Sequence, residues 1–149
     1  MGSTLAFGTP AVVVYDDSIH HHSSAVRVTP HAIKAGTLGD FKNIKLDADQ
    51  KTSSPFYVQV DVENVGKEDL SGGSPGAYLN GVDDRGQDQN EVIFFGDFPK
   101  CESKIPKSFK PDAKYSTCLT YLIPKGGSLK GMRWIAFDEK TGKSNIDWK

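Results

Sequence analysis

The sequence predicts an all-β protein, an antiparallel β-sandwich of seven or eight short strands. The main observation is the stretch 56–66, FYVQVDVENVG, in which apolar and polar residues alternate. Because successive side chains of a strand point to opposite faces, this pattern predicts one dry and one wet face. The dry face is expected to hold Phe56, Val58, Val60 and Val62, and the wet face Tyr57, Gln59, Asp61 and Glu63. Several further strand-like segments, turn residues between them and no amphipathic helix pattern favour a sandwich around this central strand.

Four segments precede the central strand. Residues 11–15, AVVVY, follow Gly8-Thr9-Pro10 and are predicted to form an edge strand. Residues 16–24 are polar and are predicted to form a loop. Residues 25–33 resume a strand pattern that Pro30 interrupts, which suggests an edge or a bulge. Residues 34–54 are mostly polar and are interpreted as a long connection with one helical turn.

The second half of the chain continues with short strands. Segments 77–82 and 91–95 are expected to be strands on either side of a tight turn at 83–86. A long surface loop with three prolines should follow, at 96–114. Strands are then expected at 115–123, which ends at Pro124 and a Gly-Gly pair, at 131–137, and finally around Ile146 and Trp148.

Length and composition fit one globular domain. A chain of 149 residues can bury one core, and residues 4–149 are expected to form it. Met1-Gly2-Ser3 resembles a cloning remnant, so a secretion signal would have been lost upstream. No apolar run approaches the length of about 20 residues that a membrane-spanning helix needs.

The small net charge argues against a nucleic-acid-binding protein, although the charges are unevenly distributed. The net charge is −1, yet residues 1–99 carry 7 basic and 14 acidic side chains, whereas residues 100–149 carry 11 basic and 5 acidic. A sandwich can bring the two halves together, so mutual compensation is the simpler interpretation. The alternative is an anionic partner for the lysines at positions 100, 104, 107, 110 and 114, which lack the interleaved aromatics of a single-stranded nucleic acid site.

The two cysteines, Cys101 and Cys118, are predicted to form a disulfide. Their spacing matches neither a CxxC redox motif nor a zinc site, and an even count in a small β domain favours a bridge. Closing the loop between them would stabilise the fold by roughly 3 kcal/mol. A disulfide would place the protein outside the cytosol. Two buried free thiols are the alternative.

From about Thr4 to Lys149 the chain resembles the immunoglobulin-like, telokin-like domain of bacterial envelope lipoproteins, especially actinobacterial ones, a family largely of unknown function. The resemblance is carried by 56–66, by the Asp84-Arg85-Gly86 turn, and by 109–127, FKPDAKYSTCLTYLIPKGG. It implies an immunoglobulin-like fold, an exported and often lipid-anchored protein, and a disulfide. It transfers no catalytic residues.

The histidines suggest a metal site. His20, His21, His22 and His31 lie within 12 residues, and imidazole is the commonest transition-metal ligand. His20, His22 and His31 are the candidate ligands, with zinc, nickel or copper as the ion. A specific site needs three or four ligands held by supporting groups, so a solvated loop is the simpler interpretation.

Other motifs give weaker signals. The acidic stretch 83–91 lacks the ligand spacing of an EF-hand, so a solvated hairpin tip is favoured over calcium. Gly72-Gly73-Ser74-Pro75-Gly76 matches G-x-S-x-G, but Pro75 and Gly76 lead into a β segment rather than a helix, which argues against a nucleophile elbow. We expect no catalytic residue and no cofactor.

The aromatic residues suggest an interaction surface. Consecutive residues of a strand cannot both face inward, so Phe94 or Phe95 is expected to be exposed. The predicted surface comprises Phe94, Phe95, Phe98, Lys100 and Lys104. Function is therefore predicted as a non-enzymatic binding or interaction module of the cell envelope, secreted or lipid-anchored, with an unknown protein or a cell-wall component as partner. The alternative is a metal-binding module.

Overall fold

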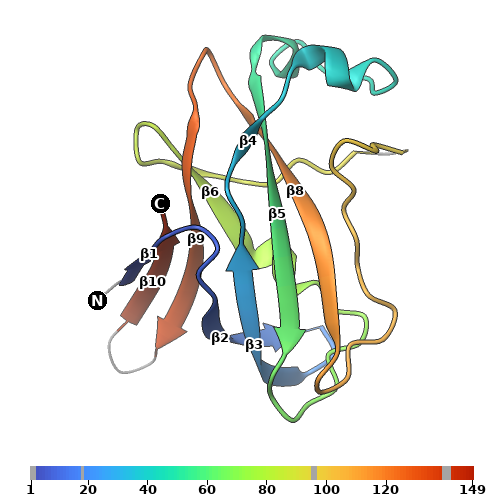
Figure 1. Cartoon of the computed structure of the whole chain (residues 1–149), viewed down its shortest axis with the longest axis vertical. Coiled ribbons are helices and arrows are strands. Elements are labelled where there is room, and N and C mark those ends of the chain that lie inside the picture. Colours follow the sequence, from blue (N-terminus) through green and yellow to red (C-terminus); the bar gives the residue numbers. More distant parts are fainter. Residues whose placement is uncertain (1–2, 18, 95–96, 139–141) are drawn as a thin grey trace.

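The computed structural model describes residues 3–17, 19–94, 97–138 and 142–149, and these form two five-stranded sheets. The sheets pack face to face around one core, so the predicted all-β sandwich is confirmed (Figure 1). The helical segments within the described residues are three short 3₁₀ turns, listed here with their bounds: η1 Leu38–Phe41, η2 Gln50–Thr52 and η3 Pro75–Tyr78.

The first sheet has the order β1-β10-β9-β6-β7. Its strands are β1 Ser3–Leu5, β10 Gly142–Trp148, β9 Leu129–Asp138, β6 Leu79–Asp83 and β7 Asp88–Gln89. The pairs are antiparallel except for β1, which runs parallel to β10 at one edge. The ends of the chain are thus held together in one sheet, as Figure 1 shows.

The second sheet is built around β5. Its strands are β2 Ala11–Asp17, β3 His22–Pro30, β4 Lys34–Ala35, β5 Ser54–Asn64 and β8 Lys114–Ile123. Strand β3 pairs with residues 60–64 of β5, and β4 continues along the same side at residues 56 and 57. Strand β8 pairs with the other side of β5 from Ser54 to Glu63. The predicted central strand is therefore confirmed.

Several segments differ from the sequence prediction. The strand expected at 77–82 begins only at Leu79, and the connection expected at 34–54 holds β4 and two 3₁₀ turns rather than one helical turn. The strand expected at 91–95 is wrong for Glu91–Phe94, because this segment bonds to β8 through Val92 N–H to the Thr120 carbonyl (2.8 Å) without forming a ladder. Phe95 lies outside the described residues. The loop expected at 16–24 is shorter, because β2 and β3 extend to Asp17 and His22.

The core between the sheets is built from large, fully buried side chains. The largest are Trp134, Trp148 and Tyr121. Two of them have a hydrogen-bond partner for their polar atom. Trp148 Nε1 donates to the Thr9 carbonyl (2.8 Å), and the Tyr121 hydroxyl donates to the Leu79 carbonyl (2.9 Å). Amphipathic aromatic residues can be buried at little cost when their polar group finds a partner in this way.

Asn64 ends β5 and joins three parts of the chain. It is fully buried, and its side-chain oxygen accepts from Ser24 Oγ (2.9 Å) and from the Gly66 N–H (3.2 Å). Its Nδ2 donates to the carbonyls of Glu68 (2.8 Å) and Phe109 (3.0 Å). An asparagine amide can make four hydrogen bonds, and here all four are made.

Replacement of this side chain should strongly destabilise the fold. We expect Asn64→Ala to lower the free energy of unfolding by about 2–4 kcal/mol, because it leaves several buried donors and acceptors unpaired. Urea unfolding followed by the fluorescence of the buried tryptophans measures this. The exposed Asn43→Ala is the control and should change it by less than about 0.5 kcal/mol. A loss below about 1 kcal/mol for Asn64→Ala would contradict the assignment.

Candidate binding groove

A second hydrophobic cluster covers part of the outer face of β5 and β8, on the side away from the main core. Its buried members are Phe41, Tyr57, Phe98, Cys101, Cys118 and Leu122. The prediction that Tyr57 lies on a wet face is therefore wrong. Its ring packs against Phe41 and Phe98, with centroid distances of 6.5 and 5.8 Å, and its hydroxyl donates to Asp40 Oδ2 (2.8 Å). Burial, together with Asp40, raises the pKa of Tyr57 well above its ordinary value.

The loop that carries Phe98 and Cys101 covers the outer face of β8, and the Cys101–Cys118 disulfide ties it to this strand. The predicted bridge is therefore confirmed. Two hydrogen bonds continue the attachment: Cys118 N–H donates to the Glu102 carbonyl (3.1 Å), and Lys104 N–H donates to Thr117 Oγ1 (2.8 Å). Residues 101–104 are thus held along the edge of β8 by one covalent and two hydrogen bonds. A rigid wall results on one side of the exposed sheet face.

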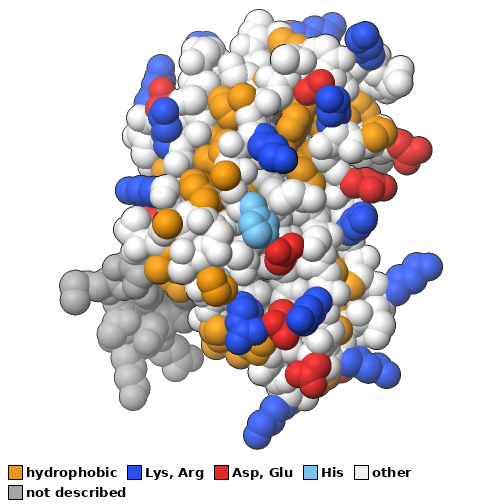
Figure 2. Space-filling view, viewed as in Figure 1, with side chains coloured by type: hydrophobic (Ala, Val, Ile, Leu, Met, Phe, Trp, Pro, Cys, Tyr) orange, Lys and Arg blue, Asp and Glu red, His pale blue; other side chains and the backbone are white. Residues whose placement is uncertain are grey.

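Between this wall and the segment after β3 lies a groove of about 770 Å³. Its floor is formed by Tyr57, Gln59 and Asp61 of β5 and by Ser116, Thr117 and Cys118 of β8; its walls are His31, Ala32 and Lys34 on one side and Pro99, Lys100, Cys101, Glu102 and Lys104 on the other. This volume lies within the range of about 300–1,000 Å³ that is typical of ligand sites. Figure 2 shows basic, acidic and hydrophobic side chains interspersed on the face that it presents.

Asp61 organises the polar floor of the groove. Its Oδ1 accepts from Ser116 Oγ (2.6 Å), and its Oδ2 is hydrogen bonded to His31 Nε2 (2.7 Å). The bond from Ser116 and then that from His31 lower the pKa of Asp61. The serine donates to the carboxylate rather than to the imidazole, so this arrangement differs from a nucleophile activated by a base. It presents polar atoms of fixed orientation to the groove instead.

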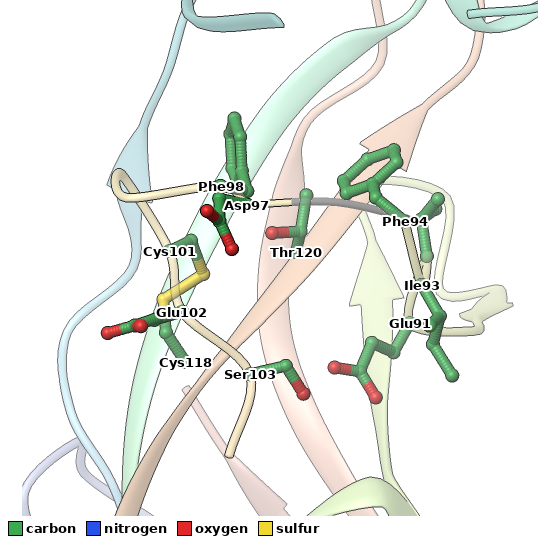
Figure 3. Close-up of a pocket in the computed structure, with 11 residues that line it drawn as sticks. Glu91, Ile93, Phe94, Asp97, Phe98, Cys101, Glu102, Ser103, Cys118 and Thr120 are labelled. Atoms are coloured by element: carbon green, nitrogen blue, oxygen red, sulfur yellow. A yellow bond between two sulfur atoms is a disulfide. The ribbon is translucent and has the colours of Figure 1, made fainter. Parts of the chain in front are cut away.

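A smaller cavity of about 190 Å³ lies on the other side of the disulfide. Figure 3 shows Glu91, Ile93 and Phe94 on one side of it, with the disulfide, Asp97 and Phe98 on the other. Glu91 is partly buried here, and burial raises the pKa of its carboxyl group to about 7. Glu102 lines both cavities, but Glu91 and Asp97 line only the smaller one, whereas the groove walls carry three lysines.

The predicted interaction surface is only partly placed as expected. Phe98 is 7% exposed, and Phe94 is partly buried against it and Phe41, with ring centroids 5.5 and 5.3 Å away. The expectation that Phe98 belongs to an exposed patch is wrong, because these aromatic rings fill the second cluster. Phe95 lies outside the described residues. Lys100 and Lys104 are exposed and line the groove wall.

The histidines are not brought to one place. His20 Nδ1 bonds to the buried Asp17 (2.7 Å), His22 Nδ1 lies 4.0 Å from Glu68, and His31 bonds to Asp61. His22 begins β3 and His31 follows its last residue, so a strand of roughly 30 Å separates them. His20, His22 and His31 therefore do not share one ion. Among the described residues, no group of three or more His, Cys, Asp or Glu side chains could hold a metal.

Sequence reasoning missed most of the groove residues. Gln59 and Asp61 lay on the strand face that was expected to be wet, which was their only signal. Their role depends on the register that sets Gln59 opposite Cys118 and Asp61 opposite Ser116. Lys34 gave no signal, because the two-residue strand β4 brings it to the groove, and Glu91 stood out only as the end of the acidic stretch 83–91.

Comparison with known proteins identifies the class of fold. No protein-family model matches the chain, and no curated protein matches it. A secreted protein from Mycobacterium tuberculosis, MPT63, has a similar crystal structure, with a TM-score of 0.64 over 100% of this chain and 98% of that chain, at 9% sequence identity. This likeness shows the fold alone: an immunoglobulin-like β-sandwich, here with a disulfide. None of the described helices is long and apolar enough to cross a membrane.

Glu91 should make stability depend on pH. Its pKa in the folded protein, about 7, lies above the ordinary 4.5, so folding favours the protonated carboxyl group. As the pH rises from 4.5 through 7 the folded state must carry a half-buried charge, and the free energy of unfolding should fall by about 1–2 kcal/mol after allowance for partial exposure. Glu91→Gln should remove this fall.

Urea midpoints at pH 5 and pH 8 test the prediction for wild type and Glu91→Gln. The exposed Glu68→Gln is the matched control and should keep the wild-type pH dependence. Equal pH dependence in wild type and Glu91→Gln would show that the carboxyl group titrates normally.

Loss of the disulfide should loosen the groove wall before the core. The double variant Cys101→Ser with Cys118→Ser is expected to lose about 2–4 kcal/mol of stability. Amide hydrogen exchange should become faster in residues 97–104, while the amides of β3 and β5 should keep their order of protection. Wild type reduced under native conditions provides the control. Unchanged exchange in residues 97–104 would show that packing alone holds this loop.

Proposed function

We propose that this protein is an extracytoplasmic, non-enzymatic binding domain that takes its ligand in the groove between Lys34 and Lys104. The observation that carries the proposal is the groove itself, a cavity of about 770 Å³ with one covalently fixed wall and a polar floor. Sites of this kind are usually largely preformed, which lowers the entropic cost of binding.

The disulfide supports a location outside the cytosol. Both cysteines of the chain are used in it, and such bridges persist mainly in oxidising compartments. The similar protein MPT63 is described as secreted. We further propose that the protein is located in the cell envelope and carries a lipid anchor upstream. The resemblance to envelope lipoproteins supports this.

The chemistry of the groove supports binding rather than catalysis. Its carboxylate, imidazole and hydroxyl groups at Asp61, His31 and Ser116 are bonded around one acceptor, so each is fixed in orientation. Lys34, Lys100 and Lys104 lie on the walls, and Gln59 offers an exposed amide on the floor. A polar ligand with anionic groups, from a partner protein or from the cell wall, fits this lining.

Site-specific photocrosslinking tests the proposal. A benzoylphenylalanine at Gln59, on the groove floor, should capture a discrete partner on intact cells of the producing organism. The same group at Lys130, exposed on β9 of the other sheet, is the matched control and should not capture it. Adding Lys34→Glu and Lys104→Glu should reduce capture from position 59 several-fold, because the groove walls would then repel anionic groups. Capture from neither position, or equally from both, would argue against the groove as the site.

A further inference from the structure

Strand β2 is an edge of the second sheet, and its outer main-chain groups are open. Val14 lies opposite Ala25 of β3, whose carbonyl accepts from Val65 N–H (3.0 Å) on the far side of β3. Ala25 therefore does not bond to β2, and the N–H and C=O of Val14 point away from the sheet. The same follows for Val12 and Asp16, two residues to either side. The Asp16 carbonyl indeed accepts from the Tyr78 hydroxyl (3.4 Å) on this outer side.

The side chains along this edge are also unusual for a solvent-exposed strand. Val12 is 57% exposed and Val14 is 67% exposed. Natural sheets protect long apolar edges with charged residues, proline or a bulge. Pro10 and Asp16 flank this edge, but residues 11–15 contain none of these features. Within the parts of the chain that the structure describes, no main-chain group pairs with the Val12–Val14 edge. Two apolar side chains and four main-chain groups thus face solvent together.

We propose that β2 pairs antiparallel with β2 of a second copy of this chain, around a two-fold axis through Val13. The two sheets would join edge to edge into one continuous sheet across the dimer. This pairing is independent of the groove and of its ligand.

The register follows from which edge groups are still available. Only residues whose main-chain groups point away from β3 can form hydrogen bonds across the axis. For both Val12 and Val14 to form such bonds, the axis must pass through residue 12, 13 or 14. An axis at Val13 sets Val12 opposite Val14 of the second copy, and each of these pairs exchanges two hydrogen bonds. It also sets Pro10 opposite Asp16. Pro10 has no N–H to donate to the Asp16 carbonyl of the second copy. That carbonyl already accepts from the Tyr78 hydroxyl, so it is not left unpaired.

The other two registers leave groups unsatisfied. An axis at Val12 sets Pro10 opposite Val14, whose carbonyl would then face a residue without an N–H. An axis at Val14 sets Val12 opposite Asp16, so its N–H would compete with the Tyr78 hydroxyl for one carbonyl. The edge is therefore self-complementary in one register, and this is why a second copy fits it better than an arbitrary strand.

The valine side chains favour the same arrangement. On the outer face, Val12 of each copy would lie beside Val14 of the other, with Cα atoms about 5.5 Å apart. The four exposed valine side chains would cover one another. The interface is limited to one short strand from each copy and is small, so we expect a reversible, concentration-dependent dimer rather than an obligate one.

Sedimentation equilibrium of the full chain over a wide concentration range tests the proposal. Wild type should show a monomer–dimer equilibrium, and Val14→Lys should weaken association at least tenfold. The Val14 side chain points to solvent, so the variant should keep the wild-type circular dichroism and melting temperature. Ile105→Lys, which changes a 63% exposed side chain in the loop before β8, is the matched control and should associate like wild type.

Engineered cysteines test the register separately. Mixed Val12→Cys and Val14→Cys chains under mild oxidation should form a crosslinked heterodimer, because their Cα separation suits a disulfide. Each variant alone should crosslink much less. Self-crosslinking of Val12→Cys or of Val14→Cys alone would overturn the Val13 axis. A monomer at all concentrations, or a dimer that Val14→Lys leaves unchanged, would overturn the pairing itself.

Discussion

The structure depends on the pairing of β5 with β8. These strands match residue for residue from Ser54 to Glu63 of β5, and the ladder is covered on both faces along part of its length. The inner face packs against the other sheet, where Val58 and Leu119 are almost fully buried. The outer face carries Tyr57 and Cys118 under a second cluster. A ladder enclosed in this way is shielded from water, which strengthens its hydrogen bonds and fixes the position of everything attached to it.

The groove arises where this outer cover stops. The cluster around Phe98 and the disulfide occupies one end of the exposed face, and Asp61 with its two hydrogen-bond partners lies beyond it. One side of the groove is thus a covalently tied loop, while the floor is a sheet whose positions are fixed by its ladder. Binding residues placed on such rigid elements are held more precisely than residues on a free loop. The same sheet ends at β2, whose open edge offers a different kind of contact, through main-chain groups rather than side chains.

Particular residues show how far sequence reasoning could reach for the site. The cysteine pair was predictable, because only two cysteines exist and their spacing fits no other role. Lys100 and Lys104 were predicted on a surface and do line the groove. Phe98 was misplaced because it lies in a loop that covers the outer face of β5 and β8. Alternation of residues along β5 cannot reveal that a distant loop will cover the face predicted to be wet. Lys34 and Glu91 could not be assigned to these cavities, because nothing local distinguishes them from the other charged residues of the chain.

The sequence by itself determined the fold class, the central strand and the covalent link. Alternation of apolar and polar residues is a local property, since it follows from the geometry of one strand, and two cysteines leave one possible pair. Tertiary structure decided which parts of the wet face remain exposed, where the histidines lie and which groups meet at Asp61. These depend on strand register and on loop packing, which bring together residues such as His31, Asp61 and Ser116. Contacts between residues so far apart in the chain leave no periodic pattern in the sequence.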